Sequence, residues 1–264
     1  MKGVVLSLEG KVALVTGGSR GIGAATVKMF RAAGARVVFS YEKAQDAATA
    51  LAAELGGGEV CRAVRQELRT PEDGRALVAA AVAAFGRVDC LIVNHGVWPA
   101  HDQPIATMTD AQWRGTLSIN LDSVFGLVQA GVADMLARMF VAEGEVRGHV
   151  VLIASTAAQR GEAFHADYAA SKGALISLTK SLSSELAPRG IYVNCVAPGW
   201  VGTEMSMAAL SDPETSKRAT ALIPLGRVGH VDEIAAPVLF LCTRWAGFVS
   251  GEVFNVNGGA VLVG

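Results

Sequence analysis

Two kinds of apolar pattern alternate along the chain. Short runs rich in β-branched and other apolar residues are separated by longer, alanine-rich stretches with helical spacing. This alternation is typical of a parallel sheet that is covered by helices on both faces. The pattern predicts strands at residues 12–16, 36–40, 60–66, 90–93, 149–154, 192–196 and 253–256, with helices in the gaps.

The chain reads as one domain. It has 264 residues, of which 51% are hydrophobic and 18% are charged, which is enough to bury one large core. No change of composition marks a second domain, and the glycines at 56–58 read as a turn into the third strand. We therefore expect residues 1–264 to form one α/β domain with a doubly wound parallel sheet of about seven strands. Such sheets bind ligands outside the carboxyl ends of their strands.

Charge and composition exclude several functional classes. A net charge of −1 gives no electrostatic reason to bind nucleic acid or an anionic membrane. The apolar run at residues 4–8 is too short for a signal peptide, and no run approaches the length of a membrane span. The four cysteines are scattered without Cys-x-x-Cys spacing, and the five histidines are dispersed. These features agree with a cytoplasmic enzyme and predict no metal site.

A glycine-rich turn follows the first predicted strand and leads into a helix. The glycines are Gly17, Gly21 and Gly23, in the spacing Gly-x-x-x-Gly-x-Gly. Glycines leave room for a pyrophosphate to approach the backbone at the positive end of the helix. The alternative is a turn that is rich in glycine only because it is tightly packed. Its place after the first strand of a β/α chain favours nucleotide binding.

Tyr168 and Lys172 are four residues apart in a predicted helix, and Ser155 ends the fifth predicted strand. Side chains four apart lie on one helical face, so the Lys172 ammonium can lie beside the Tyr168 phenol. A nearby positive charge lowers the pKa of a phenol, which suits it to acid-base catalysis. The alternative is a half-buried aromatic residue with a lysine stem packed along it.

Together these motifs resemble the short-chain dehydrogenase/reductase family from about Leu8 to the last few residues. The resemblance rests on the Thr-Gly-x-x-x-Gly-x-Gly turn, on Ser155 followed by Tyr168-x-x-x-Lys172, and on Pro-Gly-Trp-Val-Gly-Thr at 198–203. It implies a Rossmann-like fold and an enzyme that transfers a hydride between NAD(P)(H) and a ketone or secondary alcohol.

The resemblance also implies a role for each catalytic residue. Tyr168 acts as the acid and base, and Ser155 hydrogen-bonds the same substrate oxygen. Lys172 lowers the pKa of Tyr168 and binds the nicotinamide ribose. Asn120 kinks its helix and holds a water that links Lys172 to solvent. Val201 bonds the nicotinamide carboxamide through its backbone.

The same resemblance implies a set of cofactor contacts along the edge of the sheet. These are Gly17, Ser19, Arg20, Gly21, Ile22, Gly23, Ser40, Tyr41, Glu67, Leu68, Asn94, Gly96, Tyr168, Lys172, Pro198, Gly199, Val201 and Thr203.

The residues near the second strand favour NADP(H) over NAD(H). An acidic residue at its end would bond the 2'-hydroxyl of NAD, but Tyr41 stands there. Arg20 can pair with the extra phosphate of NADP, and Ser40 and Lys43 can add donors. Glu42 argues the other way, because a carboxylate that pointed inward would repel the phosphate.

Two residues depart from the family pattern. Glu67 stands where an aspartate usually accepts a bond from the adenine amino group, and it can still do so. His95 stands where alanine is usual, in a loop under the cofactor ribose, and we expect its side chain to turn away from the cleft.

The substrate is defined only coarsely. Residues 204–222 resemble the family's variable substrate lid. Met205 and Met207, with Trp98, Phe164 and Trp200, suggest an apolar pocket of adaptable shape, although each can instead be ordinary core or a subunit contact. No arginine or lysine is clearly directed at the pocket, which argues against a phosphorylated or acidic substrate. A ketone or secondary alcohol of modest size, including an oxoacyl thioester, fits best.

Two functional classes other than an oxidoreductase are possible on this fold. A cofactor-binding sensor or scaffold is expected to have lost Ser155, Tyr168 or Lys172, and all three are present. An epimerase or dehydratase of related fold usually carries a longer C-terminal substrate region.

Family members are commonly homotetramers, and the apolar faces of residues 123–139 and 174–186 fit such an assembly, although burial within the monomer explains part of the pattern.

Overall fold

Seven parallel strands form one sheet in a computed structural model that describes residues 3–138 and 146–262. The sheet order is β3-β2-β1-β4-β5-β6-β7, so the winding reverses between β1 and β4. This confirms the doubly wound α/β fold. The strands are β1 (Val12–Val15), β2 (Arg36–Tyr41), β3 (Cys61–Arg65), β4 (Cys90–Val93), β5 (Gly148–Ile153), β6 (Ile191–Pro198) and β7 (Val253–Val256).

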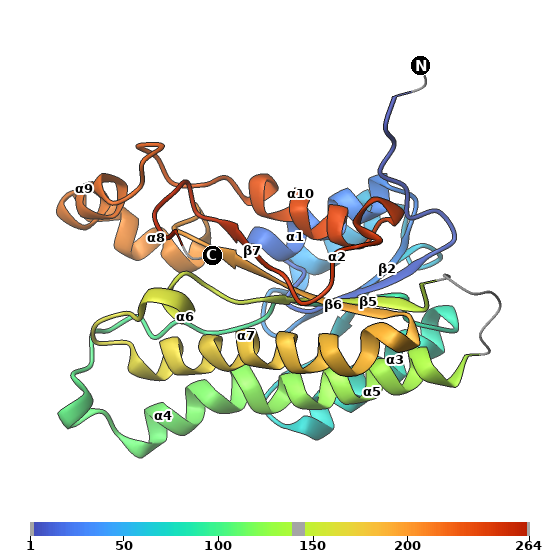
Figure 1. Ribbon diagram of the computed structural model, residues 1–264, viewed down its shortest axis with the longest axis horizontal. Helices are drawn as coiled ribbons and strands as arrows, with labels where there is room; N and C mark the ends of the chain where they lie inside the picture. The colour runs from blue at the N-terminus through green and yellow to red at the C-terminus, as the bar shows by residue number, and fades with distance from the viewer. Residues whose placement is uncertain (1–2, 139–145, 263–264) are drawn as a thin grey trace.

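Helices cover both faces of the sheet, as Figure 1 shows. On one face lie α1 (Gly21–Ala32), α2 (Gln45–Glu54) and α10 (Val231–Leu241), and on the other lie α3 (Pro71–Phe85), α5 (Ser123–Ala137) and α7 (Ala166–Leu186). The remaining helices are α4 (Asp110–Leu117), the π-helix η2 (Ser118–Asp122), α6 (Ala157–Arg160), α8 (Glu204–Ser211), α9 (Pro213–Ala221), and the 3-10 turns η1 (Ile105–Thr107), η3 (Ala187–Arg189) and η4 (Arg244–Ala246).

The core consists of two apolar layers, one on each face of the sheet. Successive strand residues point to opposite faces, so Ala13 and Val15 join one layer while Val12 and Leu14 join the other. All four are fully buried. Burial on both faces explains why the strands read as short apolar runs in the sequence.

The predicted helices of the assembly faces are present. Residues 174–186 lie within α7, and α5 covers most of 123–139, although Met139 lies outside the described residues. Within residues 3–138 and 146–262, none of the helices combines the length and the apolar character that crossing a bilayer requires.

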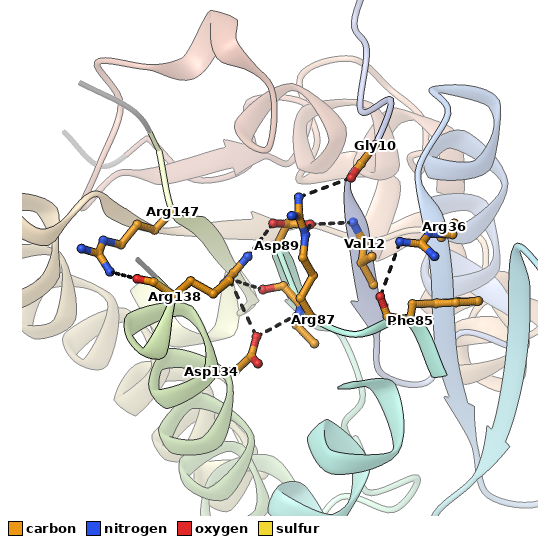
Figure 2. A network of polar contacts seen from close by, with 10 residues as sticks. Gly10, Val12, Arg36, Phe85, Arg87, Asp89, Asp134, Arg138 and Arg147 are labelled. Atoms are coloured by element: carbon orange, nitrogen blue, oxygen red, sulfur yellow. Dashed lines mark hydrogen bonds and ion pairs between the residues drawn. The ribbon is translucent and has the colours of Figure 1, made fainter. Parts of the chain in front are cut away.

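A buried carboxylate ties the amino ends of the central strands together. Asp89 accepts hydrogen bonds from the Val12 amide at 2.8 Å, from Arg87 Nε at 2.8 Å and from Arg138 Nη1 at 2.7 Å (Figure 2). Asp134 of α5 accepts from the neighbouring Val88 amide at 3.0 Å. A buried charge must be paired and hydrogen-bonded, and here both conditions are met. This network holds the end of the sheet that lies opposite the ligand edge.

Candidate active site

A cleft of about 630 Å³ opens along the carboxyl ends of the strands. Its walls come from the segments that follow β1 to β6, the edge where doubly wound sheets bind ligands. Most of the predicted site residues line it: Gly17, Ser19, Arg20, Gly21, Ile22, Ser40, Tyr41, Glu67, Leu68, Asn94, Gly96, Ser155, Tyr168, Lys172, Pro198, Gly199, Val201 and Thr203. Gly23 and Asn120 are not among the residues that line the cleft.

The glycine turn is held from two sides. The Gly17 amide donates to Ser40 Oγ at 3.1 Å, and Asn94 Nδ2 donates to the Gly17 carbonyl at 3.2 Å. Gly17 has a φ of +62°, which favours glycine. A Cβ at Gly23 would lie only 2.1 Å from the Gly17 carbonyl oxygen. Gly23 therefore acts from behind the cleft, where it lets α1 start directly under the turn.

The first turn of α1 presents free amide groups to the cleft. Its N-cap residue, Arg20, has an extended backbone and makes no side-chain cap, and the first turn contains no acidic residue. Uncapped amides and the positive end of the helix dipole form an anion-binding site. The turn therefore fits the diphosphate of a dinucleotide.

The three residues expected to bind the 2'-phosphate of NADP(H) differ in their surroundings. Ser40 is only 1% exposed, and its hydroxyl oxygen already accepts from the Gly17 amide, so Ser40 supports the turn as well as lining the cleft. Lys43 Nζ lies 3.4 Å from a carboxylate oxygen of Glu42, and both side chains line the cleft. Arg20 also lines the cleft, and no ion pair with a carboxylate is found for it in the described part of the chain.

Glu67, which the sequence predicts to bond the adenine, lines the cleft. Its carboxylate accepts a hydrogen bond from Arg69 Nε, and both residues line the cleft. That contact is the first cause of the raised pKa of Arg69. The second carboxylate oxygen of Glu67 can still accept a bond from a base amino group.

Ser155, Tyr168 and Lys172 meet on the floor of the cleft. Ser155 follows β5, and its hydroxyl hydrogen-bonds the phenol of Tyr168 at the start of α7. One turn further along, Lys172 is 4% exposed and donates from Nζ to the Ile153 carbonyl at 2.7 Å. The three residues come from two elements that pack side by side, as the sequence predicted.

The direction of the Tyr168 pKa shift is opposite to the prediction. Burial raises the pKa of Tyr168 to about 12, with the Glu162 carboxylate also raising it and only the Ser155 hydrogen bond lowering it. The Lys172 ammonium bonds the Ile153 carbonyl instead of the phenol, and burial lowers the pKa of Lys172 itself to about 8. Burial disfavours the charged form of each group. It therefore raises the pKa of the Tyr168 phenol and lowers the pKa of the Lys172 ammonium.

Asn120 lies in the π-helix that joins α4 to α5, at the position where the sequence predicts a kink. Its Oδ1 accepts from the Val97 amide at 2.8 Å, and its Nδ2 donates to the Val97 carbonyl and to Ser171 Oγ, each at 3.0 Å. A Cβ at Gly96 would lie 3.2 Å from both Asn120 Oδ1 and Lys172 Nζ. Asn120 thus fixes the loop after β4 against α7, and its role in holding a water stays a prediction.

His95 still lines the cleft, where the sequence predicted that its side chain would turn away, and its ring joins a polar network. Its Nδ1 lies 2.8 Å from Thr16 Oγ1, and its Nε2 lies 3.1 Å from the Ile119 carbonyl and 2.8 Å from Ser123 Oγ. Burial lowers the pKa of His95 to about 3, so the ring is neutral. A neutral ring that donates from Nε2 to Ile119 and accepts at Nδ1 from Thr16 satisfies both nitrogens. His95 therefore joins the end of β1 to the π-helix.

Comparison with known proteins decides the family. The family model described as enoyl-(acyl carrier protein) reductase matches residues 17–261. The 3-oxoacyl-[acyl-carrier-protein] reductase FabG of Escherichia coli (strain K12) is 36% identical over 258 residues, covering 98% of this chain and 100% of that protein. A short-chain dehydrogenase/reductase structure from Brucella melitensis has a TM-score of 0.86 at 36% identity, covering 97% of this chain and 98% of the other.

The chain is a short-chain dehydrogenase/reductase.

Other relatives of this dehydrogenase/reductase differ in substrate. The acetoacetyl-CoA reductase of Shinella zoogloeoides is 36% identical over 96% of this chain and 99% of its own length. The L-rhamnose 1-dehydrogenase (NAD(P)(+)) of Azotobacter vinelandii is 36% identical over 94% of this chain and 96% of its own length. The protein is thus an NAD(P)-dependent oxidoreductase, and the sensor alternative gains no support.

Only some of the residues predicted to form an apolar substrate pocket line the cleft. Trp98, Trp200 and Met205 line it. Phe164 and Met207 do not line the cleft, and both are more than half exposed. The predicted lid, 204–222, folds as α8 and α9, which Figure 1 shows at one end of the molecule, and only its first residues reach the cleft.

Two charged residues of this dehydrogenase/reductase were missed in the sequence. Arg160, at the end of α6, and Glu162, in the loop before α7, both line the cleft near Trp98. The available signal was their closeness in sequence to Tyr168, because Arg160 and Glu162 lie eight and six residues before it. The local pattern did not reveal which way this loop turns, because that depends on the packing of Trp98.

Proposed function

We propose that this short-chain dehydrogenase/reductase transfers hydride between NADP(H) and a neutral ketone or secondary alcohol, with Tyr168 as the acid and base. The single observation that carries the proposal is that Ser155, Tyr168 and Lys172 line one cleft together with the glycine turn. A bound cofactor supplies the hydride, and the protein supplies position, proton and charge stabilisation.

The chemistry of Ser155 and Tyr168 suits reduction of a carbonyl. With a pKa of about 12, Tyr168 is a protonated phenol at neutral pH and holds the proton that the carbonyl oxygen must receive. The Ser155 hydroxyl can donate to the same oxygen as its negative charge develops. Lys172, with a pKa of about 8, exchanges a proton close to physiological pH, so we assign it the replacement of the Tyr168 proton.

The cofactor contacts follow from the walls of the cleft. The glycine turn and the amides that start α1 hold the diphosphate, and Gly96 leaves room beside Lys172 for the nicotinamide ribose. Val201 and Thr203 would contact the nicotinamide, and Glu67 and Leu68 would contact the adenine, since all four line the cleft. Asn94 and Asn120 keep these walls in place.

The proposal is tested by following NADPH absorbance with a panel of cyclic and open-chain ketones. Steady oxidation of NADPH that depends on a ketone is the expected result. Tight NADPH binding without turnover of any ketone would instead favour a binding protein. Cofactor binding is measured separately by NADPH fluorescence, so that inactivity is distinguished from failure to bind.

Arg20 is the residue that we expect to select NADP(H). A guanidinium pairs strongly with a phosphate, and Arg20 lines the cleft beside Gly21. Related structures support this preference: a blue fluorescent protein from a metagenomic library is described in complex with NADPH, at 36% identity and a TM-score of 0.85 over 97% of this chain and all of the other.

Arg20→Ala is expected to weaken NADPH binding about 10-fold, or about 1.4 kcal/mol, because the 2'-phosphate loses its cation. NADH binding should change less than about 2-fold, since NADH has no such phosphate. Titration calorimetry with both cofactors measures the difference. Lys28→Ala is the matched control, because Lys28 is a cation on the same helix that pairs with Glu54 outside the cleft. Equal losses for NADPH and NADH in Arg20→Ala would contradict this assignment.

We also propose that the enzyme works in the cytoplasm as a homotetramer. All four cysteines are free and buried, which suits a reducing compartment. The aromatic side chain of Phe125 remains exposed on one of the faces expected to associate, in α5, and Trp113 of α4 and Phe254 of β7 are also exposed. Sedimentation equilibrium should give about four times the mass of the 27.3 kDa chain, and a purely monomeric mass would refute the assembly.

A further inference from the structure

Glu162 lines the same cleft as Trp98 and Tyr168. The residue is half-buried in the loop between α6 and α7, and its Oε1 accepts a hydrogen bond from Trp98 Nε1 at 3.3 Å. Its other oxygen, Oε2, has no hydrogen-bond partner in the described part of the chain and is not sealed away from solvent. A carboxylate that is held by one oxygen leaves the second as an acceptor for a ligand.

The position of Glu162 brings it within electrostatic reach of the reacting groups. Burial raises its pKa above the ordinary value, and His165, Trp98 and Arg160 oppose that shift. In turn, the Glu162 carboxylate helps to raise the pKa of Tyr168. Glu162 and Tyr168 line the same cleft, so a substrate whose carbonyl meets the phenol can present another of its groups to Glu162.

Trp98 provides a rigid aromatic wall beside this acceptor. One face of its indole stacks on His165, with ring centroids 4.7 Å apart and an interplanar angle of 13°, and its ring packs against Trp200 in a T-shaped arrangement, with centroids 6.2 Å apart and an interplanar angle of 77°. His165 is buried, and its Nε2 lies 2.9 Å from the Pro99 carbonyl. With both its stacking partner and its Nε1–H fixed, Trp98 is preorganised to cover the C–H face of a ring.

We propose that the substrate is a neutral hydroxylated carbonyl compound or polyol, one of whose hydroxyls donates to the free oxygen of Glu162 while Trp98 covers its C–H face. This inference rests on the proposed function and adds a substrate class to it. The reaction is balanced without a further reactant, since the hydride of NADPH goes to the carbonyl carbon, the Tyr168 proton goes to its oxygen, and NADP⁺ and the alcohol are the products.

The charges around Glu162 argue against other substrate classes. An alkyl or acyl chain would desolvate the carboxylate without giving it a donor, which is unfavourable. An anionic substrate would be repelled by Glu162, and an ammonium would be repelled by Arg160, which lines the same cleft. Hydroxyls both donate and accept, so they match this mixed pair of charges without carrying one.

The test compares 2-hydroxycyclohexanone with cyclohexanone, two rings that differ by one hydroxyl, in NADPH-dependent reduction. We expect wild type to prefer the hydroxyketone by about 10-fold or more in kcat/KM, as one hydrogen bond to a charged acceptor allows. Acetoacetyl-CoA is assayed in the same way as a third substrate, to represent the acyl thioesters. Glu162→Leu should bring the preference close to 1, and Glu162→Gln, which keeps the shape and one acceptor, should give an intermediate value.

Asp102→Asn is the matched control. Asp102 is a second carboxylate close enough to raise the pKa of Glu162, but its side chain is 73% exposed and does not line the cleft. This variant should keep the wild-type preference. NADPH affinity, measured by fluorescence, shows that each variant is folded.

The outcomes separate this inference from the proposed function. A preference for cyclohexanone or acetoacetyl-CoA, or an unchanged preference in both Glu162 variants, would overturn the substrate class while leaving the reductase intact. Loss of turnover by the same factor on both ketones would mean that Glu162 only positions Trp98, and would also overturn it. Turnover of no carbonyl compound by wild type would remove the proposed function, and this inference with it.

Discussion

Tyr168→Phe is expected to bind NADPH as tightly as wild type and to lose about 10³-fold in kcat, the range that a positioned proton donor contributes. The substitution removes one oxygen from a residue at the start of α7 whose ring stays in place. Without the phenol, the carbonyl oxygen must take its proton from water. Single-turnover kinetics with saturating NADPH measures the effect on the chemical step.

Ser155→Ala is the useful companion to Tyr168→Phe. It removes the hydroxyl that bonds the phenol but leaves the proton donor, so we expect a smaller loss than for Tyr168→Phe. Because removing Ser155 takes away the one contact that lowers the pKa of Tyr168, the phenol should remain protonated in this variant. Substantial residual turnover by Tyr168→Phe would show that another group supplies the proton.

Gly23→Ala is expected to weaken NADPH binding about 100-fold, or about 2.7 kcal/mol, and to lower the melting temperature. A Cβ at this position would lie 2.1 Å from the Gly17 carbonyl oxygen and 2.7 Å from Asn94 Nδ2. The nearest atom belongs to the backbone, so the turn must move to make room, and the amides that face the diphosphate move with it. Fluorescence titration and calorimetric melting measure the two effects.

Gly58→Ala is the control for Gly23→Ala. Gly58 lies in the exposed turn before β3, has no positive φ, and an added Cβ would meet nothing within 4 Å. We expect wild-type cofactor affinity and a melting temperature that changes little. If Gly23→Ala bound NADPH as wild type does, the turn would be plastic and the close approach of α1 would not be required.

The strands were predicted closely because their signal is local. Continuous apolar runs bounded by glycine and polar residues mark strands that are buried on both faces, and residues 90–93 and 253–256 agree with β4 and β7 without change. β6 runs to Pro198, two residues beyond the prediction, because its last residues pair with β7. The end of a strand depends on its neighbour, and here each paired residue of the neighbour lies 58 positions further along the chain.

His95 shows where the sequence stops being informative. As a large residue in a loop under the cofactor ribose, it suggested only that the side chain turns aside. Its partners are Thr16, Ile119 and Ser123, which come from three different parts of the chain. No local pattern connects these residues, so its bridging role emerges only from the packed structure.

From the order of its residues alone, this protein was determined to be a doubly wound dehydrogenase/reductase with a glycine cradle and a Ser155, Tyr168 and Lys172 set, because spacing along strands and helices already brings these groups to one edge. Tertiary structure decided their ionisation. Burial keeps Tyr168 protonated, the Ile153 carbonyl takes the Lys172 ammonium, and Trp98 holds Glu162 in the cleft. Desolvation and side-chain partners depend on segments that are distant in the chain, which is why only the fold settles them.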